Sequence, residues 1–513
     1  MPSRTQKRTI ILAFVLVASM LVILNKSQIS DFHKNSASVQ EVLHYVLQKK
    51  TFLMWPNMNP IPETITLKTL PLDRLSDLYY SYVNTLQVFC PVKRVYGGVK
   101  FGWYTCDLIK DESPKACVSY MIADKDINNA FFEELRQDYQ CERNVILKST
   151  ITAAQNASSI ENNYPVSMLK SKVKVDYMAI DTGGDETALL SWMLTNSLLE
   201  NVRQLLVSFH GIDADSKQSV YLEHLQVLRK LYSEGFRTFH FARNIQCVFK
   251  GNSRRTGCYT LYMMRQVSVK GPLEVYTQDS IKNQPLNRLA TLYNSLLVSS
   301  QVHCKQVVRL GKVDDGGWDV CNDTEYRPTS PCLVYSFGVA GDWSFDDQVS
   351  TVYGCDVHSF DPSIGKPDHK RSEKITFHNL GLWGRPKGKK GKWNMMNLKG
   401  IIEMLGHTER IIDIIKMDIE ASEWEAIPDM LATGVLKNVR QLDFEFHGSP
   451  NPSESLRSKL TSLRGINDQG FKLYWSHPNI KGGNPTKLSV TGRQVSSCYE
   501  NYYLNTKLSK NKV

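Results

Sequence analysis

The chain has 513 residues, of which 42% are hydrophobic and 22% charged, as in ordinary globular proteins. This composition excludes a largely disordered, collagen-like or coiled-coil chain, and a single long apolar run excludes a polytopic membrane protein. The 62 lysines and arginines exceed the 51 acids and give a net charge of +11. The basic residues are dispersed except at 385–392 (RPKGKKGK), and no zinc-finger or RNP pattern accompanies that cluster. We therefore expect no nucleic-acid partner.

The N-terminal segment predicts a secretory-pathway protein. A basic tail at residues 1–8 precedes the apolar run Ile10–Leu24, which favours a transmembrane signal anchor at 9–25, a stem at 26–67 and a lumenal body in the Golgi or ER. A cleaved signal peptide, and hence secretion, is the alternative, although no small-residue cleavage site closes the run. Either interpretation makes the sequons at Asn156 and Asn322 available for glycosylation.

The body contains two similar segments. Val202–Gly211 (VRQLLVSFHG) is similar to Val439–Gly448 (VRQLDFEFHG), and at the same offset of 237 residues Met178–Leu190 corresponds to the segment KMDIEASEWEAIP. Self-similarity at a fixed distance indicates a repeated structural unit. We predict two copies of one fold, at residues 68–268 and 282–508, with an insertion in the second copy that carries the basic cluster.

Ten of the eleven cysteines have a counterpart in the other copy. Cys90, Cys106, Cys117 and Cys141 precede Cys304, Cys321, Cys332 and Cys355 by 214 or 215 residues, Cys258 precedes Cys498 by 240, and Cys247 is left over. In a lumenal protein these favour disulfides over buried free thiols. Cys332 and Cys355 each precede a predicted strand, and the starts of neighbouring parallel strands lie about 5 Å apart, within disulfide reach. Cys304–Cys321 is the second local pair. No CxxC or HxxxH spacing is present, so we predict no metal site.

The second copy alternates predicted strands with predicted helices. Strands are expected at 333–338, 357–360, 375–378, 411–417, 439–446, 471–475 and 498–503, and helices at 344–353, 397–405, 422–432 and 453–463. This alternation predicts a doubly wound α/β sheet of the Rossmann-like kind. Ligands of such sheets bind at the carboxyl ends of the strands.

Two strand ends indicate a nucleoside-containing cofactor. The first predicted strand leads into Gly338-Val339-Ala340-Gly341-Asp342, where glycines let the backbone approach a ligand. Asp361 ends the next strand, about 20 residues further on, at a place suited to ribose hydroxyls. A tight strand–helix turn and a turn-capping aspartate are the structural alternatives. No GxxxxGK[ST] motif is present, which excludes a P-loop.

Acids and histidines follow the remaining strands. Asn379 follows the third strand, Asp418 and Glu420 the fourth, and Glu445 and His447 the fifth. Such a group suits general-base work on a hydroxyl, or metal-assisted positioning of one. For Glu423 we favour a first-turn helix role, because acids are stabilised there by the helix dipole. A structural role for His447 is also open, since His210 takes its place in the first copy.

The first copy lacks these features. Gly338 and Gly341 correspond there to Ala123 and Asp126, while Glu420 and Glu445 correspond to Gly183 and Ser208. The apolar framework persists, so we expect the first copy to keep the fold without holding the cofactor in the same way.

The segments LVYSFGVAGDWSFDDQV, HSFDP, ITFHNLGLWG and IDIIKMDIEASEWEAIPDML resemble the methyltransferase-like protein 24 family, which is related to FkbM-type S-adenosylmethionine-dependent methyltransferases. The resemblance covers residues 300–505 and, more faintly, the first copy. It implies a class I methyltransferase fold that binds S-adenosylmethionine. It places Gly338 and Gly341 at the methionine moiety, Asp361 at the ribose, and Asp418 and Glu420 at the transferred methyl group and its acceptor.

The sequence therefore predicts two tandem Rossmann-like sheets after a membrane anchor. The cofactor is predicted to be S-adenosylmethionine, and the acceptor a hydroxyl-bearing glycan or secreted protein. We expect Gly338, Gly341, Asp342, Asp361 and Asn379 to bind the cofactor, and Asp418, Glu420, Glu445 and His447 to supply the base. A non-catalytic lumenal binding protein is the alternative. A Rossmann oxidoreductase is disfavoured, because it predicts a fuller G-x-G-x-x-G after the first strand.

Overall fold

A computed structural model of the chain describes residues 59–99, 102–107, 117–124, 129–156, 169, 174–265, 276–479, 481 and 485–509. All of these belong to one unit, residues 55–513. The anchor predicted at 9–25 lies outside the described residues. Within them, every helix is too short or too polar to cross a bilayer.

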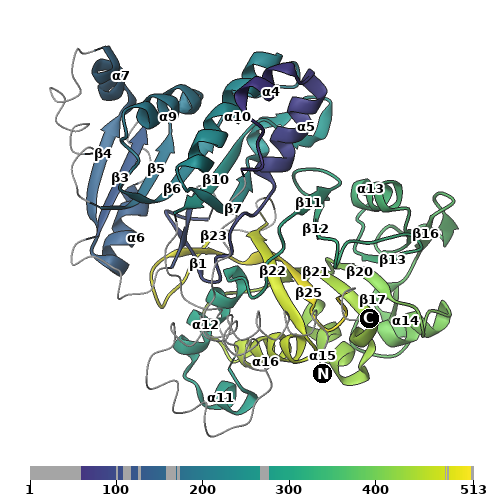
Figure 1. Cartoon of the computed structure of the whole chain (residues 1–513). Helices are drawn as coiled ribbons and strands as arrows, with labels where there is room; N and C mark the ends of the chain where they lie inside the picture. The colour runs from purple at the N-terminus through teal and green to yellow at the C-terminus, as the bar shows by residue number, and fades with distance from the viewer. Residues whose placement is uncertain are drawn as a thin grey trace, which may run out of the picture. The chain divides into compact units, whose positions relative to one another are not determined.

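The C-terminal half is built on an eight-stranded sheet in the order β15-β16-β14-β13-β20-β21-β25-β22 (Figure 1). Five adjacent strands of the sheet are parallel, and β25 runs antiparallel between β21 and β22. The strands are β13 (Leu333–Phe337), β14 (Asp356–Phe360), β15 (His369–Lys370), β16 (Ile375–His378), β20 (Ile412–Met417), β21 (Val439–His447), β22 (Phe471–Pro478) and β25 (Cys498–Asn505). The predicted doubly wound α/β sheet is thus present.

Helices cover both faces of this sheet. One face packs against α12 (Leu286–Val298), α14 (Leu398–Met404), α15 (Glu423–Thr433) and α16 (Ser455–Asp468), and α13 (Ser344–Tyr353) packs on the other. α11 (Gln278–Asn283) precedes them. The predicted helices and strands of this half agree with the observed ones to within a few residues, because each buries an apolar stripe or a continuous apolar run. The insertion with the basic cluster forms a separate small sheet of β17 (Gly381–Leu382), β18 (Gly388–Lys390) and β19 (Trp393–Met396).

The N-terminal half has a six-stranded sheet in the order β4-β3-β5-β6-β10-β7. Its strands are β3 (Val118–Ala123), β4 (Glu142–Leu147), β5 (Val175–Asp181), β6 (Val202–Phe209), β7 (Arg237–Arg243) and β10 (Tyr259–Met264). Its helices are α4 (Thr64–Thr69), α5 (Leu72–Val83), α6 (Asn129–Tyr139), α7 (Lys148–Asn156), α9 (Glu186–Thr195) and α10 (Gln218–Ser233). The order matches β14-β13-β20-β21-β25-β22 strand for strand, with the reversed strand in the same place. Descent of the two halves from a duplication stays a prediction.

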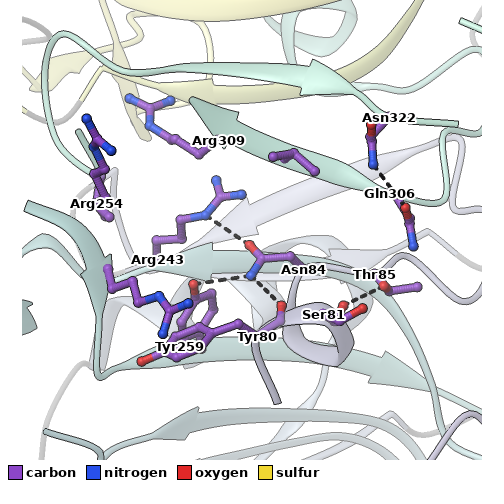
Figure 2. A pocket seen from close by; sticks show the side chains of 13 residues that line it. Tyr80, Ser81, Asn84, Thr85, Arg243, Arg254, Tyr259, Gln306, Arg309 and Asn322 are labelled. Atoms are coloured by element: carbon purple, nitrogen blue, oxygen red, sulfur yellow. Dashed lines mark hydrogen bonds between the residues drawn. The ribbon is translucent and has the colours of Figure 1, made fainter. Parts of the chain in front are cut away.

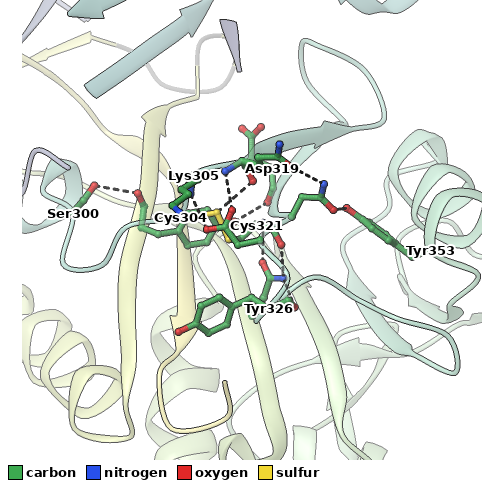
Figure 3. The surroundings of a disulfide bond; sticks show 12 residues. Ser300, Cys304, Lys305, Asp319, Cys321, Tyr326 and Tyr353 are labelled. Atoms are coloured by element: carbon green, nitrogen blue, oxygen red, sulfur yellow. Dashed lines mark hydrogen bonds between the residues drawn. A yellow bond between two sulfur atoms is a disulfide. The ribbon is translucent and has the colours of Figure 1, made fainter. Parts of the chain in front are cut away.

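Five disulfides tie the strands at their ends. Two of them are the predicted pairs Cys332–Cys355, with Cα atoms 4.6 Å apart, and Cys304–Cys321, whose surroundings Figure 3 shows. The first half repeats them as Cys117–Cys141 and Cys90–Cys106. The unmatched Cys247 pairs with Cys258, and Cys498 is left as a buried free thiol. The correspondence of Cys258 with Cys498 in sequence therefore does not extend to their bonding.

Hairpins from each half contact the other half. β11 (Val307–Leu310) and β12 (Trp318–Cys321) are joined by a loop whose Val313 N–H donates to Ser253 O at 2.7 Å; Ser253 lies on the hairpin of β8 (Val248–Phe249) and β9 (Asn252–Thr256). The equivalent hairpin of the second half, β23 (Pro485–Lys487) with β24 (Gln494–Ser496), carries Arg493 into an ion pair with Asp138 of α6. In the first half, β1 (Lys93–Tyr96) and β2 (Trp103–Cys106) form the hairpin that corresponds to β11–β12. The two halves therefore hold each other by reciprocal contacts.

Replacing Cys332 and Cys355 together by serine is expected to lower the free energy of unfolding by about 3 kcal/mol, because the bond closes a loop of moderate length in the unfolded chain. Guanidinium denaturation of the oxidised protein measures the change. A thiol assay on the denatured wild type, without reductant, is expected to count a single reactive thiol, which Cys498→Ser removes. An unchanged unfolding midpoint in the double variant would contradict the expectation.

Candidate cofactor and acceptor site

The turn after β13 is shaped by a close backbone approach. Gly338 has a φ of +77°, and a Cβ added there would lie 1.6 Å from the carbonyl oxygen of Asp418. Its N–H donates to Phe360 O at 2.9 Å. The adjacent end of β20 therefore requires a glycine at 338, and the predicted place of Gly338 at the cofactor stays a prediction.

Asp361 lies directly against this turn. Its carboxylate accepts hydrogen bonds from the Ala340 N–H at 2.7 Å and from the N–H and hydroxyl of Ser363 at 2.8 and 2.6 Å. Only 4% of Asp361 is exposed. Gly341 follows with a φ of +83°, and a Cβ there would meet no atom within 4 Å. The predicted pairing of the glycine turn with Asp361 therefore exists, and Gly341 faces open space beside it.

The other two predicted cofactor residues make their bonds within the protein. The carboxylate of Asp342 accepts from the Ser344 N–H at 2.9 Å and lies 2.6 Å from Lys312 Nζ. Burial pushes the pKa of Asp342 upward, but these bonds outweigh it and hold the pKa below its ordinary value. Asp342 therefore fixes the start of α13. The backbone N–H of Asn379 donates to Asp368 at 2.8 Å.

The four predicted base candidates meet around one imidazole. His447 Nε2 lies 3.7 Å from Glu420, 3.8 Å from Glu445 and 4.0 Å from Asp418, while its Nδ1 lies 3.1 Å from Oε1 of Glu423. These groups come from the ends of β20 and β21 and the first turn of α15. The convergence predicted from the strand ends is present, with Glu423 as a fifth member.

Burial and crowding retain protons in this cluster. Burial, together with the neighbouring carboxylates of Asp418 and Glu500, raises the pKa of Glu445. Burial also raises the pKa of Asp418. Although burial disfavours the charged imidazole, the contact with Glu423 and the other carboxylates raise the pKa of His447 to about 9. At neutral pH an imidazolium therefore lies beside Glu445 and Asp418, whose raised pKa values mean that they hold protons more tightly than free carboxyls, an arrangement that can exchange a proton with a bound hydroxyl.

Part of the cluster is framework, because the first half repeats it. Glu186 accepts from the Thr182 N–H at 2.9 Å and lies 3.2 Å from His210 Nδ1, just as Glu423 accepts from the Ile419 N–H at 3.1 Å and contacts His447. Both glutamates are almost fully buried. The Glu423–His447 pair thus pins the turn after one strand to the end of the next. Its role was missed because burial of a first-turn glutamate has no sequence signal.

The second half adds a strained acidic turn to that framework. Glu420 and Ala421 have φ values of +53° and +68°, in the left-handed region that side chains disfavour by about 1–2 kcal/mol per residue. The corresponding residues of the first half, Gly183 and Gly184, adopt φ values of +67° and +130°. The first half therefore relieves the turn with glycine, whereas the second keeps an acid there with 88% of its side chain exposed. Strain retained at an exposed acid indicates a functional constraint.

A buried lysine closes the same edge from the other side. Lys416 Nζ donates to the carbonyls of Phe337, at 3.1 Å, and of Gly338, and it lies 5.0 Å from the centre of the Trp318 ring. The first half has Ala179 in its place. The ammonium neutralises carbonyl dipoles at the end of β13 and favours the ionised form of Asp418. A lysine in a mainly apolar strand is the sequence signal for a role of Lys416 at this edge. Nothing in the sequence indicated that Trp318 would lie beside it.

Two cavities border the first sheet instead of this edge. One of about 500 Å³ lies at the ends of β5, β6 and β7 and is lined among others by Asp181, His210, Tyr262 and Trp475. The other, of about 370 Å³, is lined from α5, β7, β9 and β11 (Figure 2).

Comparisons with known proteins agree with the fold and the strand-end motifs. Residues 268–491, which make up most of the second half, match the model of a methyltransferase domain family. The chain is 25% identical to the probable methyltransferase-like protein 24 of Rattus norvegicus over 247 residues and to that of Homo sapiens over 246. Each alignment covers 44% of this chain and about two thirds of the relative, 67% and 66%. Over this part of its length the chain is thus similar to the methyltransferase-like protein 24 family.

Solved structures that align with the chain include phosphoethanolamine N-methyltransferase 2 of Haemonchus contortus. Its complex with S-adenosylhomocysteine and phosphomonomethylethanolamine is 10% identical and covers 70% of this chain and 80% of its own, with a TM-score of 0.22. Its complex with S-adenosyl-L-methionine is 9% identical and covers 77% and 96%, with the same TM-score.

Replacing Glu420 by glycine is expected to raise the free energy of unfolding by about 1 kcal/mol, because glycine adopts the left-handed turn without strain. Chemical denaturation measures the gain. The matched control is Gly183→Ala in the first half, which introduces the same strain and is expected to lower stability by a similar amount. Loss of stability in Glu420→Gly would show that the carboxylate itself holds the turn.

The raised pKa of His447 predicts how stability depends on pH. Because the folded protein binds this proton more tightly than the unfolded chain, its contribution is complete below the ordinary value of 6.5 and disappears as the pH rises towards about 9. Glu445, whose pKa is also raised, acts in the same direction. We expect the free energy of unfolding to fall between pH 6.5 and 9 in the wild type and to fall less in His447→Gln. Equal slopes in the two proteins would contradict the assignment.

Proposed function

We propose that the second half is an S-adenosylmethionine-dependent methyltransferase that acts on an oxygen nucleophile. The observation that carries the proposal is the strained, exposed Glu420 beside His447 and Asp418, at the position where the first half has an unstrained glycine. The methyltransferase domain match and the named relatives support the reaction class.

The residues at the end of β13 suit this cofactor. Gly341 leaves open space where the turn meets Asp361, and Asp361 keeps the backbone of Ala340 in place. In the proposal, Gly341 makes room for the methionine part, and the remaining acceptor capacity of Asp361 serves the ribose hydroxyls. When bound, S-adenosylmethionine supplies an electrophilic methyl group on a sulfonium.

The protein's own contribution is position and a proton acceptor. Asp418 and Glu420 have side chains 28% and 88% exposed, so they can reach an acceptor hydroxyl, whereas Glu445 is held inside by Asn479 at 2.6 Å. Glu420 or Asp418 accepts the hydroxyl proton as the oxygen attacks, and the imidazolium of His447 balances the carboxylates in the meantime. His447 and Glu445 thus act through the exposed acids.

We further propose that the reaction takes place in the secretory pathway, on a glycan or a secreted protein. The five disulfides of the structure support this compartment, since such bonds persist in oxidising surroundings. The competing proposal is a non-catalytic binding protein. The first half supports it, because that half keeps the fold without counterparts of Gly338, Gly341 and Glu420.

Calorimetric titration with S-adenosylmethionine separates the two. The wild type is expected to bind, and Gly341→Asn is expected to weaken binding at least tenfold, because asparagine tolerates the left-handed backbone but fills the open space. Gly406→Asn is the matched control: Gly406 has a φ of +72° and open surroundings but follows α14, at the opposite edge of the sheet. It is expected to leave binding unchanged. Absence of binding by the wild type would favour the non-catalytic protein.

A further inference from the structure

The 370 Å³ cavity between the two halves has a strongly basic lining. Four arginines line it: Arg243, Arg254, Arg255 and Arg309. The described lining residues include no aspartate or glutamate, and the remaining polar groups are tyrosine, serine, threonine, asparagine and glutamine. Figure 2 shows Arg243, Arg254 and Arg309 on one side of the cavity, with Gln306 and Asn322 on the other.

The charges of Arg243 and Arg309 are balanced by buried acids. Asp319, fully buried, lies 2.8 Å from Arg243 and 3.1 Å from Arg309, and Glu500 lies 3.3 Å from Arg309. The two guanidiniums hold the pKa of Asp319 far below its ordinary value against the effect of burial. This balanced group is a rigid wall, because Arg243 also donates to Asn84 at 3.1 Å and Arg309 to Asp314 O at 2.8 Å.

The other two arginines carry charge that the structure leaves available. Arg254 is exposed and has no ion pair within the described part of the chain. Arg255 donates to the Ser76 hydroxyl at 3.2 Å and lies 4.7 Å from the centre of the Tyr80 ring, which are both uncharged. Its ion pair with Asp77, at 3.6 Å, joins side chains that are 43% and 63% exposed, and such a pair contributes little. The cavity lining therefore contains two weakly compensated guanidiniums, those of Arg254 and Arg255, in addition to Arg243 and Arg309, whose charges are balanced by Asp319 and Glu500.

The hairpin that carries them is held in place. Cys247–Cys258, the disulfide without a counterpart in the second half, closes the base of β8–β9. A Cβ at Gly257 would lie 1.7 Å from Ile212 O, so this hairpin docks closely on the first sheet. The Ser253 carbonyl accepts the Val313 N–H from the opposite half. A binding group on a fixed hairpin loses little conformational entropy when a ligand arrives.

We propose that this cavity binds a small molecule or glycan unit bearing a phosphate or sulfate ester. The planar guanidinium fork matches the oxygens of such esters, and one or two negative charges balance Arg254 and Arg255. The volume accommodates a monosaccharide-sized group, whose hydroxyls meet the amide of Gln306. The site is separate from the proposed methyl-transfer edge, so its test needs no S-adenosylmethionine.

Calorimetry with glucose 6-phosphate, glucose 6-sulfate and glucose tests the proposal and distinguishes the two esters. All proteins carry Thr324→Ala, which removes the sequon at Asn322 without changing that lining residue. At least one ester is expected to bind, and glucose itself is expected to bind at least tenfold more weakly. Arg254→Glu is expected to weaken ester binding at least tenfold. Lys250→Glu, an exposed residue of the same hairpin outside the lining, makes the same charge change and is expected to alter binding less than twofold.

The outcomes separate a built site from general charge attraction. Binding of neither ester, or equal weakening in Arg254→Glu and Lys250→Glu, would overturn the proposal. Thermal unfolding of both variants at the wild-type temperature is the accompanying check, and both residues are exposed. Preference for one ester identifies the chemistry of the natural ligand.

Discussion

A single buried carboxylate organises the carboxyl edge of the second sheet. Glu423 is fully buried and joins the backbone at Ile419 to the imidazole of His447, so the turn after β20 and the end of β21 move as one. Removing one partner of such a buried pair leaves an uncompensated polar group, whose desolvation costs a few kcal/mol. The positions of Asp418, Glu420 and Glu445 all depend on this contact, since they flank the residues that it joins.

The joint between the two halves follows the same rule on a larger scale. Asp319 is shared by Arg243 of the first half and Arg309 of the second, and His477 lies 3.2 Å from it. These charges are buried together, so separation of the halves would break the ion pair between Arg243 and Asp319. Each half would then keep a charged group without its partner, which is costly in a buried setting. Together with the reciprocal hairpin contacts, this group of charges holds the two sheets in one unit.

Much of the second sheet was predictable because its strands are buried runs. Ile412–Met417 and Leu333–Phe337 are apolar over most of their length, and the disulfide Cys332–Cys355 followed from the spacing of parallel strands. The gathering of Asp418, Glu420, Glu445 and His447 followed from the rule that strand ends share an edge. The hairpins β11–β12 and β23–β24 did not follow, since short two-stranded elements are stabilised by the surface they meet and not by their own pattern.

The roles of individual site residues were harder to predict than their location. Gly338 and Asp342 fit a ligand-binding pattern in sequence, and in the structure each also has a role within the protein: Gly338 makes room for a neighbouring backbone, and Asp342 fixes a helix start. Patterns in sequence record that a residue type is needed, and the same type serves a close backbone contact and a ligand equally well. The structure separates the two uses. A Cβ at Gly338 would collide with the backbone of Asp418, whereas a Cβ at Gly341 would enter open space, so substitutions at the two positions have different consequences.

The difference between the halves is therefore the best guide to function. Both retain the glutamate–histidine framework, so that pair reflects folding. Only the second half has residues with side chains, Glu420 and Ala421, in the left-handed backbone conformation of this turn. Gly183 and Gly184 of the first half show that an unstrained alternative fits the same turn. Selection for stability alone would favour glycine at Glu420. An acid that persists there, exposed and next to an imidazole, is explained by a demand other than folding, and a bound hydroxyl that must lose its proton supplies one.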